Sequence, residues 1–410
     1  MLINNTRASR SAYPAELRAI MNIESARESG AWLSHWSQIN SSVTPLWDLP
    51  DAAETAGVAQ LSLKDESVRS PLGSFKALGA PVALMRLIVR LWKSEVALDP
   101  KAMIKGEYAG LLRDLTVISA TDGNHGKSLA AAAQTIGCRC VIVLHANVSV
   151  EREQSIAKYG AKIVRIAGNY DESVEFAAEL ARTNGWHVVS DTSYEGYETI
   201  PRDVMQGYGV IPDEIVGQIG ASSSPVPFTH VFLQGGVGGL AAGITTYLWE
   251  YYGQHRPVFI VVEPQQADCL YQSAIEGSAT RATGSVDSVM AGLACGEASP
   301  LAWKFLWPCV DYFMTISDSD AVEAMRTLAR GTDRDAPLVV GESGAAGFAG
   351  LTLLAQAPDL ARKVGLDAES RVLVISTEGA TAPNMYAELV GESAESVLAR
   401  QHEWLQGCTA

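Results

Sequence analysis

Short apolar runs rich in Val and Ile alternate along this chain with amphipathic stretches. Strands that are apolar throughout are typical of parallel sheets covered by helices on both faces. The clearest strands are expected at residues 115–120, 138–145, 161–167, 229–234, 257–264 and 371–377. Helices are expected at residues 126–137, 151–160, 170–184, 239–252, 318–330 and 343–357. This alternation predicts an α/β fold with largely parallel sheets.

The composition limits the partners of this chain. Its 410 residues are 47% hydrophobic, enough for a large core, and its formal net charge is −15. Such an acidic chain has no basic face with which to neutralise nucleic-acid phosphates or anionic lipids. The first thirty residues have no apolar stretch of signal-peptide length, and no later run reaches the roughly 18 residues of a membrane span. We therefore expect a cytoplasmic protein that binds neither nucleic acid nor membrane.

The cysteines and histidines do not indicate a metal site or a redox centre. The six cysteines include no CxxC pair, and the seven histidines are scattered. Cys269 and Cys295 lie in loop-like sequence, where we expect free thiols, with a disulfide between them as the alternative. We therefore expect no metal.

A lysine with possible chemistry lies in the segment KDESVRSPLGSFKALGA, residues 64–80. Lys76 stands where a loop containing Gly and Pro meets an apolar helix. A lysine in this place is either a reactive amine in a pocket or an ordinary solvated residue at a helix start. The segment alone leaves both interpretations open.

Two further segments are suited to binding anions. The segment ISATDGNHGKSLAAAA (118–133) combines a strand, a tight polar turn and an Ala-rich helix, whose N-terminus favours a carboxylate or a phosphate. The segment VFLQGGVGGLAAG (231–243) places four glycines between a buried strand and a helix, so its backbone can wrap an anion. Each of them could instead be an ordinary structural turn.

In this order the three segments resemble the fold-type II pyridoxal-phosphate enzymes, the group of threonine dehydratase and the tryptophan synthase β-subunit. A reactive lysine, a carboxylate-binding turn and a phosphate-binding glycine loop are the parts that an aldehyde cofactor bearing a phosphate needs. More narrowly, five motifs are similar to those of the diaminopropionate ammonia-lyases. They are KDES (64–67), TDGNHG (121–126), SDTSYEGY (190–197), MAGLACGEAS (290–299) and ISTEG (375–379).

The resemblance implies roles for individual residues. Lys76 would carry pyridoxal 5'-phosphate as a Schiff base, and Asn124 would contact the 3-hydroxyl of the cofactor. Ser376 or Thr377 would lie at the pyridine nitrogen, where a neutral hydroxyl favours elimination over transamination. The further cofactor contacts implied are Phe75, Gly235, Gly236, Val237, Gly238 and Gly239. The substrate contacts implied are Ser74, Thr121, Asp122, Gly123 and His125.

Asp122 is the most informative of these residues for the choice of substrate. In the dehydratases of this fold the position is usually a small hydroxyl residue. An aspartate there is expected to be ionised at neutral pH and to repel the substrate carboxylate. A substrate with a second ammonium at its β-carbon would compensate. Asp191, at the end of the expected strand at 187–191, is the second matching carboxylate, although both aspartates could instead cap neighbouring N–H groups.

The expected reaction is α,β-elimination of 2,3-diaminopropionate to pyruvate and two ammonia. Lys76 would take the α-proton of the L-isomer, and Asp122 that of the D-isomer. The alternative is a serine or threonine dehydratase acting on a hydroxy amino acid, which Asp122 disfavours. Ala380 and Ala382 stand where the resemblance leads us to expect more polar residues.

The resemblance also implies the domain organisation. Residues 1–84 and 191–410 would form a large cofactor-binding domain, and residues 85–190 a small mobile domain. Two open twisted sheets, largely parallel and flanked by helices, would enclose the cofactor in the cleft between the domains. A homodimer is the expectation for this family.

Overall fold

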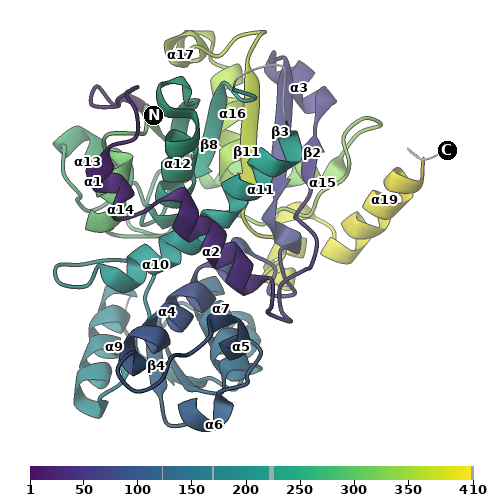
Figure 1. Ribbon diagram of the computed structural model, residues 1–410. Coiled ribbons are helices and arrows are strands. Elements are labelled where there is room, and N and C mark those ends of the chain that lie inside the picture. Colours follow the sequence, from purple (N-terminus) through teal and green to yellow (C-terminus); the bar gives the residue numbers. More distant parts are fainter. Residues whose placement is uncertain (122, 169, 221–225, 408–410) are drawn as a thin grey trace.

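The computed structural model describes the chain except for residues 122, 169, 221–225 and 408–410. The described strands form two separate sheets (Figure 1). The larger sheet has the order β1-β10-β9-β8-β11-β3-β2, and the smaller has the order β6-β5-β4-β7. The strands pair in parallel, except that β1 and β2 run antiparallel at the edges of the larger sheet. The predicted α/β class is confirmed.

The strands of the larger sheet are β1 (Leu2–Asn4), β2 (Leu46–Asp48), β3 (Gln60–Asp65), β8 (His230–Gln234), β9 (Val258–Pro264), β10 (Tyr312–Ile316) and β11 (Arg371–Ser376). Those of the smaller sheet are β4 (Thr116–Ala120), β5 (Arg139–Leu144), β6 (Lys162–Arg165) and β7 (His187–Val188). The helices up to the end of the smaller sheet are α1 (Ala15–Arg18), α2 (Ile23–Leu33), α3 (Pro50–Ala56), α4 (Ala80–Trp92), α5 (Pro100–Met103), α6 (Ala109–Leu112), α7 (Asn124–Ile136), α8 (Val150–Ala157) and α9 (Tyr170–Asn184). The later helices are α10 (Thr199–Tyr208), α11 (Val210–Ile219), α12 (Gly239–Tyr252), α13 (Cys269–Glu276), α14 (Pro300–Leu306), α15 (Asp318–Arg330), α16 (Ala346–Ala355), α17 (Pro358–Val364), α18 (Pro383–Val390) and α19 (Ala394–Gly407).

The larger sheet is buried on both faces, which explains why its central strands are apolar throughout. Successive side chains of β8 point to opposite faces, so that Val231 and Leu233 join one core cluster while Phe232 joins the other. Helix α12 packs against the first face and α16 against the second. The smaller sheet is enclosed in the same way, by α7 on one face and α9 on the other.

The boundaries of several elements differ from those predicted. The strand expected at 187–191 ends at Val188, because after Val189 the chain leaves β4 and turns into the pocket described below. There the Tyr197 hydroxyl donates to the Val188 carbonyl oxygen and accepts from the Ser190 amide. The helix expected from residue 343 begins at Ala346, since the glycine-containing segment before it packs against the chain after β11.

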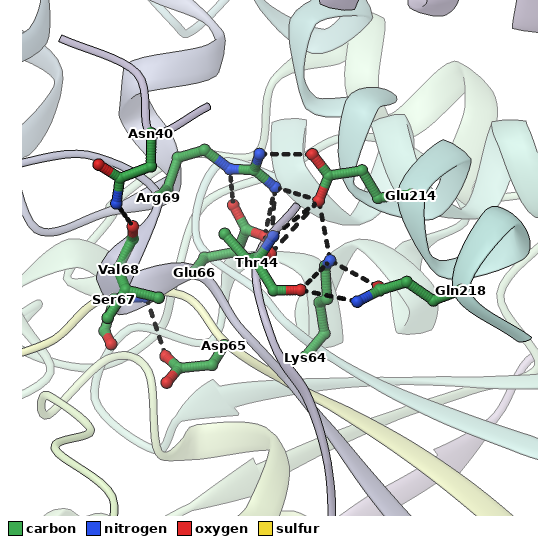
Figure 2. A network of polar contacts seen from close by, with 10 residues as sticks. All are labelled: Asn40, Thr44, Lys64, Asp65, Glu66, Ser67, Val68, Arg69, Glu214 and Gln218. Atoms are coloured by element: carbon green, nitrogen blue, oxygen red, sulfur yellow. Dashed lines mark hydrogen bonds and ion pairs between the residues drawn. The ribbon is translucent and has the colours of Figure 1, made fainter. Parts of the chain in front are cut away.

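A buried network of charged side chains holds the segment that leads to Lys76. Figure 2 shows Lys64 of β3 and Arg69 of the following loop converging on Glu214 of α11. Lys64 Nζ lies 2.8 Å from Glu214 Oε2, and two nitrogens of Arg69 also bind Glu66 at 2.8 Å. A buried charge is tolerated only when it is paired in this way. The network therefore ties the KDES motif to α11.

The two sheets are formed by different parts of the chain. The strands of the smaller sheet lie between residues 116 and 188, and those of the larger sheet lie outside 85–190. The exact division at 84/85 and 190/191 stays a prediction, since α4 runs across the first of these positions. Within the described ranges, no helix is both long and apolar enough to cross a membrane.

Candidate active site

One pocket lies at the carboxyl ends of strands from both sheets. Its lining includes Thr121 after β4, Gly236 after β8 and Thr377 after β11, together with Lys76. Side chains that follow parallel strands meet at one edge of a sheet, where open α/β folds bind ligands. The pocket between the two sheets is therefore the candidate active site.

Lys76 reaches this pocket from a 3₁₀ turn formed by Phe75–Leu78. The Phe75 amide donates to the Thr377 carbonyl oxygen at 3.0 Å, which fixes the turn to the end of β11. Two residues of α7 hold it from the other side. Ser128 Oγ donates to the carbonyl oxygen of Lys76 at 2.8 Å, and Lys127 Nζ donates to that of Leu72 at 2.9 Å.

Lys76 and Asp191 form an ion pair in the pocket, and both side chains are largely buried. Burial alone would lower the pKa of Lys76, but the Asp191 carboxylate outweighs it and raises this pKa above its usual value. Burial alone would raise the pKa of Asp191, but Lys76 and then His125 hold it well below the usual range. The pair is therefore an ammonium and a carboxylate.

His125 adds a second polar group beside Asp191. Its Nε2 binds the Val189 carbonyl oxygen at 2.8 Å, so that Nε2 carries the proton. Its Nδ1 lies 3.8 Å from Asp191 Oδ2 and has no hydrogen-bond partner among the described residues. Burial lowers the pKa of His125 despite the nearby carboxylate. The imidazole is thus neutral, with Nδ1 able to accept a proton.

The turn after β4 lines the same pocket. Thr121 Oγ1 accepts from the amides of Gly123 and Gly126 at 3.1 and 3.2 Å. Asn124 begins α7, and its Nδ2 donates to Glu378 of the other sheet. Asp122 lies outside the described residues, so its role in the site stays a prediction.

The glycine turn at residues 235–239 joins β8 to α12. A Cβ atom at Gly235 would lie 2.6 Å from Glu263 Cγ, and one at Gly238 would lie 2.9 Å from Leu306 Cδ1. Gly238 also has a φ of +100°, which favours glycine. The turn ends on the N-terminus of α12, whose first N–H groups have no acceptor within the helix. This is a suitable cradle for a phosphate.

Ser376 and Thr377, at the end of β11, differ in their surroundings. Ser376 is fully buried, and its Oγ has no hydrogen-bond partner in the described part of the chain. Thr377 lines the pocket. Buried hydroxyls are normally paired, so the unpaired Ser376 Oγ, the Lys76 amine and the glycine turn together fit an aldehyde cofactor that bears a phosphate and a ring nitrogen.

The structure brings most of the predicted site residues into one pocket. Those that line it are Phe75, Lys76, Thr121, Gly123, Asn124, His125, Asp191, Gly236, Val237, Gly238, Gly239 and Thr377. Ser74 and Gly235 are not part of the lining: Ser74 forms a backbone bridge with Glu378, and Gly235 packs against β9. Their roles toward a cofactor or a substrate stay predictions.

Among the pocket residues that were not predicted from the sequence are Glu378, Tyr208 and Arg152. Glu378 belongs to the ISTEG motif, and a carboxylate directly after a buried strand was a signal that could have identified it. Tyr208 and Arg152 lie on helices and have no local signal. Their places depend on how α10 and α8 pack.

The described residues contain no group of three or more metal-ligating side chains in one place. Cys269 and Cys295 are thiols and do not form a disulfide in the described part of the chain. Cys269 begins α13, where its Sγ donates to the carbonyl oxygen of Gly236 at 3.4 Å. The expectation of thiols in preference to a disulfide agrees with this arrangement.

Comparison with known proteins identifies the family. The model of the pyridoxal-phosphate dependent enzymes matches residues 39–378. The diaminopropionate ammonia-lyase of Escherichia coli K12 is 38% identical over 357 residues, 86% of this chain and 88% of that protein. Its structure with an aminoacrylate-PLP azomethine reaction intermediate matches 95% of this chain and 96% of that one, with a TM-score of 0.84 and 35% identity. The structure with D-serine matches 97% and 98%, with a TM-score of 0.86 and 34% identity.

The order of the motifs, the two sheets and the lysine-bearing pocket agree with these similarities. The chain is a fold-type II enzyme that uses pyridoxal phosphate, and it belongs to the family of the diaminopropionate ammonia-lyases.

Proposed function

We propose that this enzyme converts 2,3-diaminopropionate, in its L and D forms, into pyruvate and two ammonia by α,β-elimination. The observation that carries this proposal is the buried Lys76–Asp191 pair beside the glycine turn, in a chain similar over most of its length to a diaminopropionate ammonia-lyase. The overall reaction consumes one molecule of water and releases both nitrogens of the substrate as ammonia, so that its atoms balance.

The residues of the pocket would divide the work of binding. Lys76 would hold the aldehyde carbon of pyridoxal phosphate, residues 235–239 its phosphate, and Ser376 or Thr377 its ring nitrogen. When bound, the cofactor supplies an electron-withdrawing ring that stabilises negative charge at the α-carbon of the substrate. Phe75 and Asn124 would make the remaining cofactor contacts.

The substrate carboxylate would lie against the turn after β4. Thr121, Gly123, His125 and Ser74 would contact it or the neighbouring substrate atoms. Helix α7 begins in this turn, and its N-terminus favours an anion.

The proton at the α-carbon would be taken by a different group for each isomer. Lys76 Nζ would remove it from the L-isomer, and Asp122 from the opposite face of the D-isomer. Asp191 would orient the Lys76 amine and hold its charge. The β-nitrogen leaves as ammonia from an ammonium, so this step needs no general acid, whereas a β-hydroxyl does.

The alternative is a lyase of the serine or threonine dehydratase type that acts on a hydroxy amino acid. The complex of the Escherichia coli enzyme with D-serine supports binding of a hydroxy amino acid in a pocket of this kind. Asp122 disfavours this alternative as the main activity, because a carboxylate at that turn needs a cationic group on the substrate.

Product formation from a panel of amino acids tests the proposal. Pyruvate and ammonia would be measured with purified enzyme and L- and D-2,3-diaminopropionate, L- and D-serine and L-threonine. We expect diaminopropionate to react best, with two ammonia per pyruvate, and Asp122→Ser to lose the activity on the D-isomer selectively. Faster reaction of the hydroxy amino acids would overturn the substrate assignment and retain the cofactor.

We also propose that the enzyme is a cytoplasmic homodimer whose smaller domain closes over the substrate. Two polar contacts between the halves of the pocket, Asn124–Glu378 and Arg152–Glu342, support the closure. Light scattering during size-exclusion chromatography tests the dimer, and fractionation of cells that make the protein tests its location.

A further inference from the structure

Tyr208, at the end of α10, places a buried hydroxyl in the pocket. The residue is 1% exposed, and the hydroxyl has no hydrogen-bond partner among the described residues. Buried polar groups are normally paired, and an unpaired one marks a place where a ligand or a changed protonation state supplies the partner. The hydroxyl therefore has a part in the pocket that the cofactor contacts named above do not explain.

Glycines form the slot that holds the Tyr208 ring. A Cβ atom at Gly79 would lie 2.6 Å from Tyr208 Cε1, and one at Gly243 would lie 3.0 Å from Tyr208 Cβ. A Cβ atom at Gly239 would lie 3.9 Å from Cε2 on the other side of the ring. The ring thus lies between the segment after Lys76 and the start of α12, and larger side chains at positions 79 and 243 would displace it.

The same ring is part of the surroundings of the Lys76 amine. Lys76 Nζ lies 5.2 Å from the centroid of the Phe75 ring and 5.9 Å from that of Tyr208. These two rings contact each other with centroids 4.7 Å apart. An ammonium is attracted to aromatic faces at such distances. The amine is therefore enclosed by two rings and the Asp191 carboxylate.

Among the described residues, the titratable groups around the Lys76 amine are Asp191, His125, Cys295 and Tyr208. Asp191 accepts a hydrogen bond from the ammonium and so favours the protonated form. A phenol can donate its proton in a hydrogen bond to the lone pair of a neutral amine, but an ammonium has no lone pair to accept it. In the ion pair seen here the Lys76 ammonium can only donate toward the Tyr208 oxygen, and the hydroxyl makes no hydrogen bond to the described residues.

We propose that Tyr208 is a positioning residue for Lys76, whose hydroxyl donates to the neutral amine and so opposes the preference of Asp191 for the ammonium. The two groups then set the proton affinity of Lys76 from opposite directions. Burial raises the pKa of Tyr208 above its usual value, so the phenol keeps its proton at neutral pH. Because Lys76 needs a neutral form to act as a base, the inference rests on the function proposed above.

The reaction of Lys76 with an added aldehyde tests this inference without any substrate turnover. Only the neutral amine attacks the aldehyde carbon of pyridoxal phosphate, so the binding rate reports the neutral fraction of Lys76 at each pH. The rate would be followed by the visible absorbance of the bound cofactor, using the full-length chain freed of cofactor. Asp191→Asn provides the reference, because loss of the carboxylate lowers the pKa of Lys76 toward the measurable range.

In the Asp191→Asn background, Tyr208→Phe is expected to move the midpoint of the rate profile to higher pH by about 0.5–1 unit. This equals a roughly three- to ten-fold slower reaction below the midpoint, as expected for one hydrogen bond. Tyr386→Phe in the same background is the matched control. Tyr386 is also fully buried with an unpaired hydroxyl, but it packs in the other core cluster, and its removal should leave the midpoint unchanged.

A merely structural role for Tyr208 would slow the reaction equally at every pH and leave the midpoint in place, and this result would overturn the inference. A chain that never develops the visible absorbance would instead contradict the proposed function. The two failures are therefore distinguishable.

Discussion

Arg152 and Glu342 link the two halves of the active-site pocket: Arg152 Nη2 donates to Glu342 Oε1 at 2.7 Å. Arg152 lies on α8, which packs against α7 and β6 of the smaller sheet, whereas Glu342 lies in the loop before α16 of the larger sheet. The Glu342 side chain is 1% exposed, so this ion pair is shielded from solvent and differs from the weak pairs of protein surfaces. The pair exists only while the two sheets keep their present arrangement.

Glu342 is expected to make the protein less stable as the pH rises from about 4.5 to 7. Burial and the nearby Glu378 carboxylate raise the pKa of Glu342 to about 7. The same group titrates near a pH of about 4.3 in an unfolded chain. Between these values the folded state holds a proton that the unfolded state has lost, so the free energy of unfolding falls with rising pH.

Glu342→Gln removes this titration. The quantity to compare is the difference in the free energy of unfolding, wild type minus variant. This difference should fall by up to about 3 kcal/mol as the pH rises from about 4.5 to 8. Urea unfolding at several pH values measures it. Glu323→Gln, at a side chain that is 63% exposed, is the control and should leave the slope unchanged. A Glu342→Gln variant with the slope of the wild type would contradict the prediction.

Lys64 is expected to be essential to the stability of the buried network in Figure 2. Its side chain is fully buried and donates to Glu214, Gln218 and the carbonyl oxygen of Thr44. Lys64→Met leaves the carboxylates of Glu214 and Glu66 with Arg69 as their remaining cation in the network. Removal of one partner of a buried ion pair costs roughly 3–5 kcal/mol, which chemical denaturation would detect.

The double variant Lys64→Met/Glu214→Gln separates charge imbalance from lost packing. It removes one positive and one negative charge, so the free energy of unfolding should recover in part relative to Lys64→Met. No recovery would mean that packing, and not the unpaired carboxylate, dominates the loss.

The sequence predicted the strands and helices that carry the pocket because their signals are local. The apolar run at 229–234 predicts β8, and the glycines directly after it predict the turn that leads into α12. The strand β3 was missed, since Lys64 and Asp65 make it look polar although both are buried. The burial of Lys64 depends on Glu214 of α11, about 150 residues later in the chain, so no local pattern could show it.

The same distinction holds for the pocket. Lys76 and residues 235–239 were predicted from the order of three local motifs along the chain, because no single motif was decisive alone. The contact of Arg152 with Glu342 depends on the packing of two sheets. The slot of Tyr208 depends on Gly79, directly before α4, and on Gly239 and Gly243 of α12. Side chains of this kind become visible only after the chain has folded.

Ser376 and Thr377 are both predicted candidates for contact with the ring nitrogen of the cofactor, and Thr377 is the one that lines the pocket. The buried Ser376 Oγ lacks a partner, and the ring nitrogen would supply one. Ser376→Ala should weaken the binding of pyridoxal phosphate about three- to ten-fold, the effect of one hydrogen bond. Fluorescence titration measures this affinity.

Thr377→Val is the matched change. It keeps the carbonyl oxygen that accepts from the Phe75 amide, so the turn bearing Lys76 is retained and the affinity should change less. A larger loss for Thr377→Val than for Ser376→Ala would assign the ring nitrogen to Thr377.

Gly238 is expected to be required for binding the phosphate of the cofactor. Alanine at this position would hold a Cβ atom 2.9 Å from Leu306 Cδ1 and 3.1 Å from Ala302 Cβ, in a backbone conformation with φ of +100°. The turn must shift to relieve both the contact and the strain, and its amides then no longer converge. We expect Gly238→Ala to lower the affinity for pyridoxal phosphate by more than about tenfold, since several hydrogen bonds to an anion would be lost together.

The comparison of two ligands shows whether this loss concerns the phosphate. Affinity for pyridoxal, which has no phosphate, should fall much less than affinity for pyridoxal phosphate. Gly253→Ala is the control, because Gly253 also has a positive φ, of +56°, but nothing lies within 4 Å of its added Cβ atom. It imposes backbone strain away from the pocket and should leave both affinities unchanged. Equal losses for the two ligands in Gly238→Ala would show that the turn supports the pocket as a whole and does not bind the phosphate.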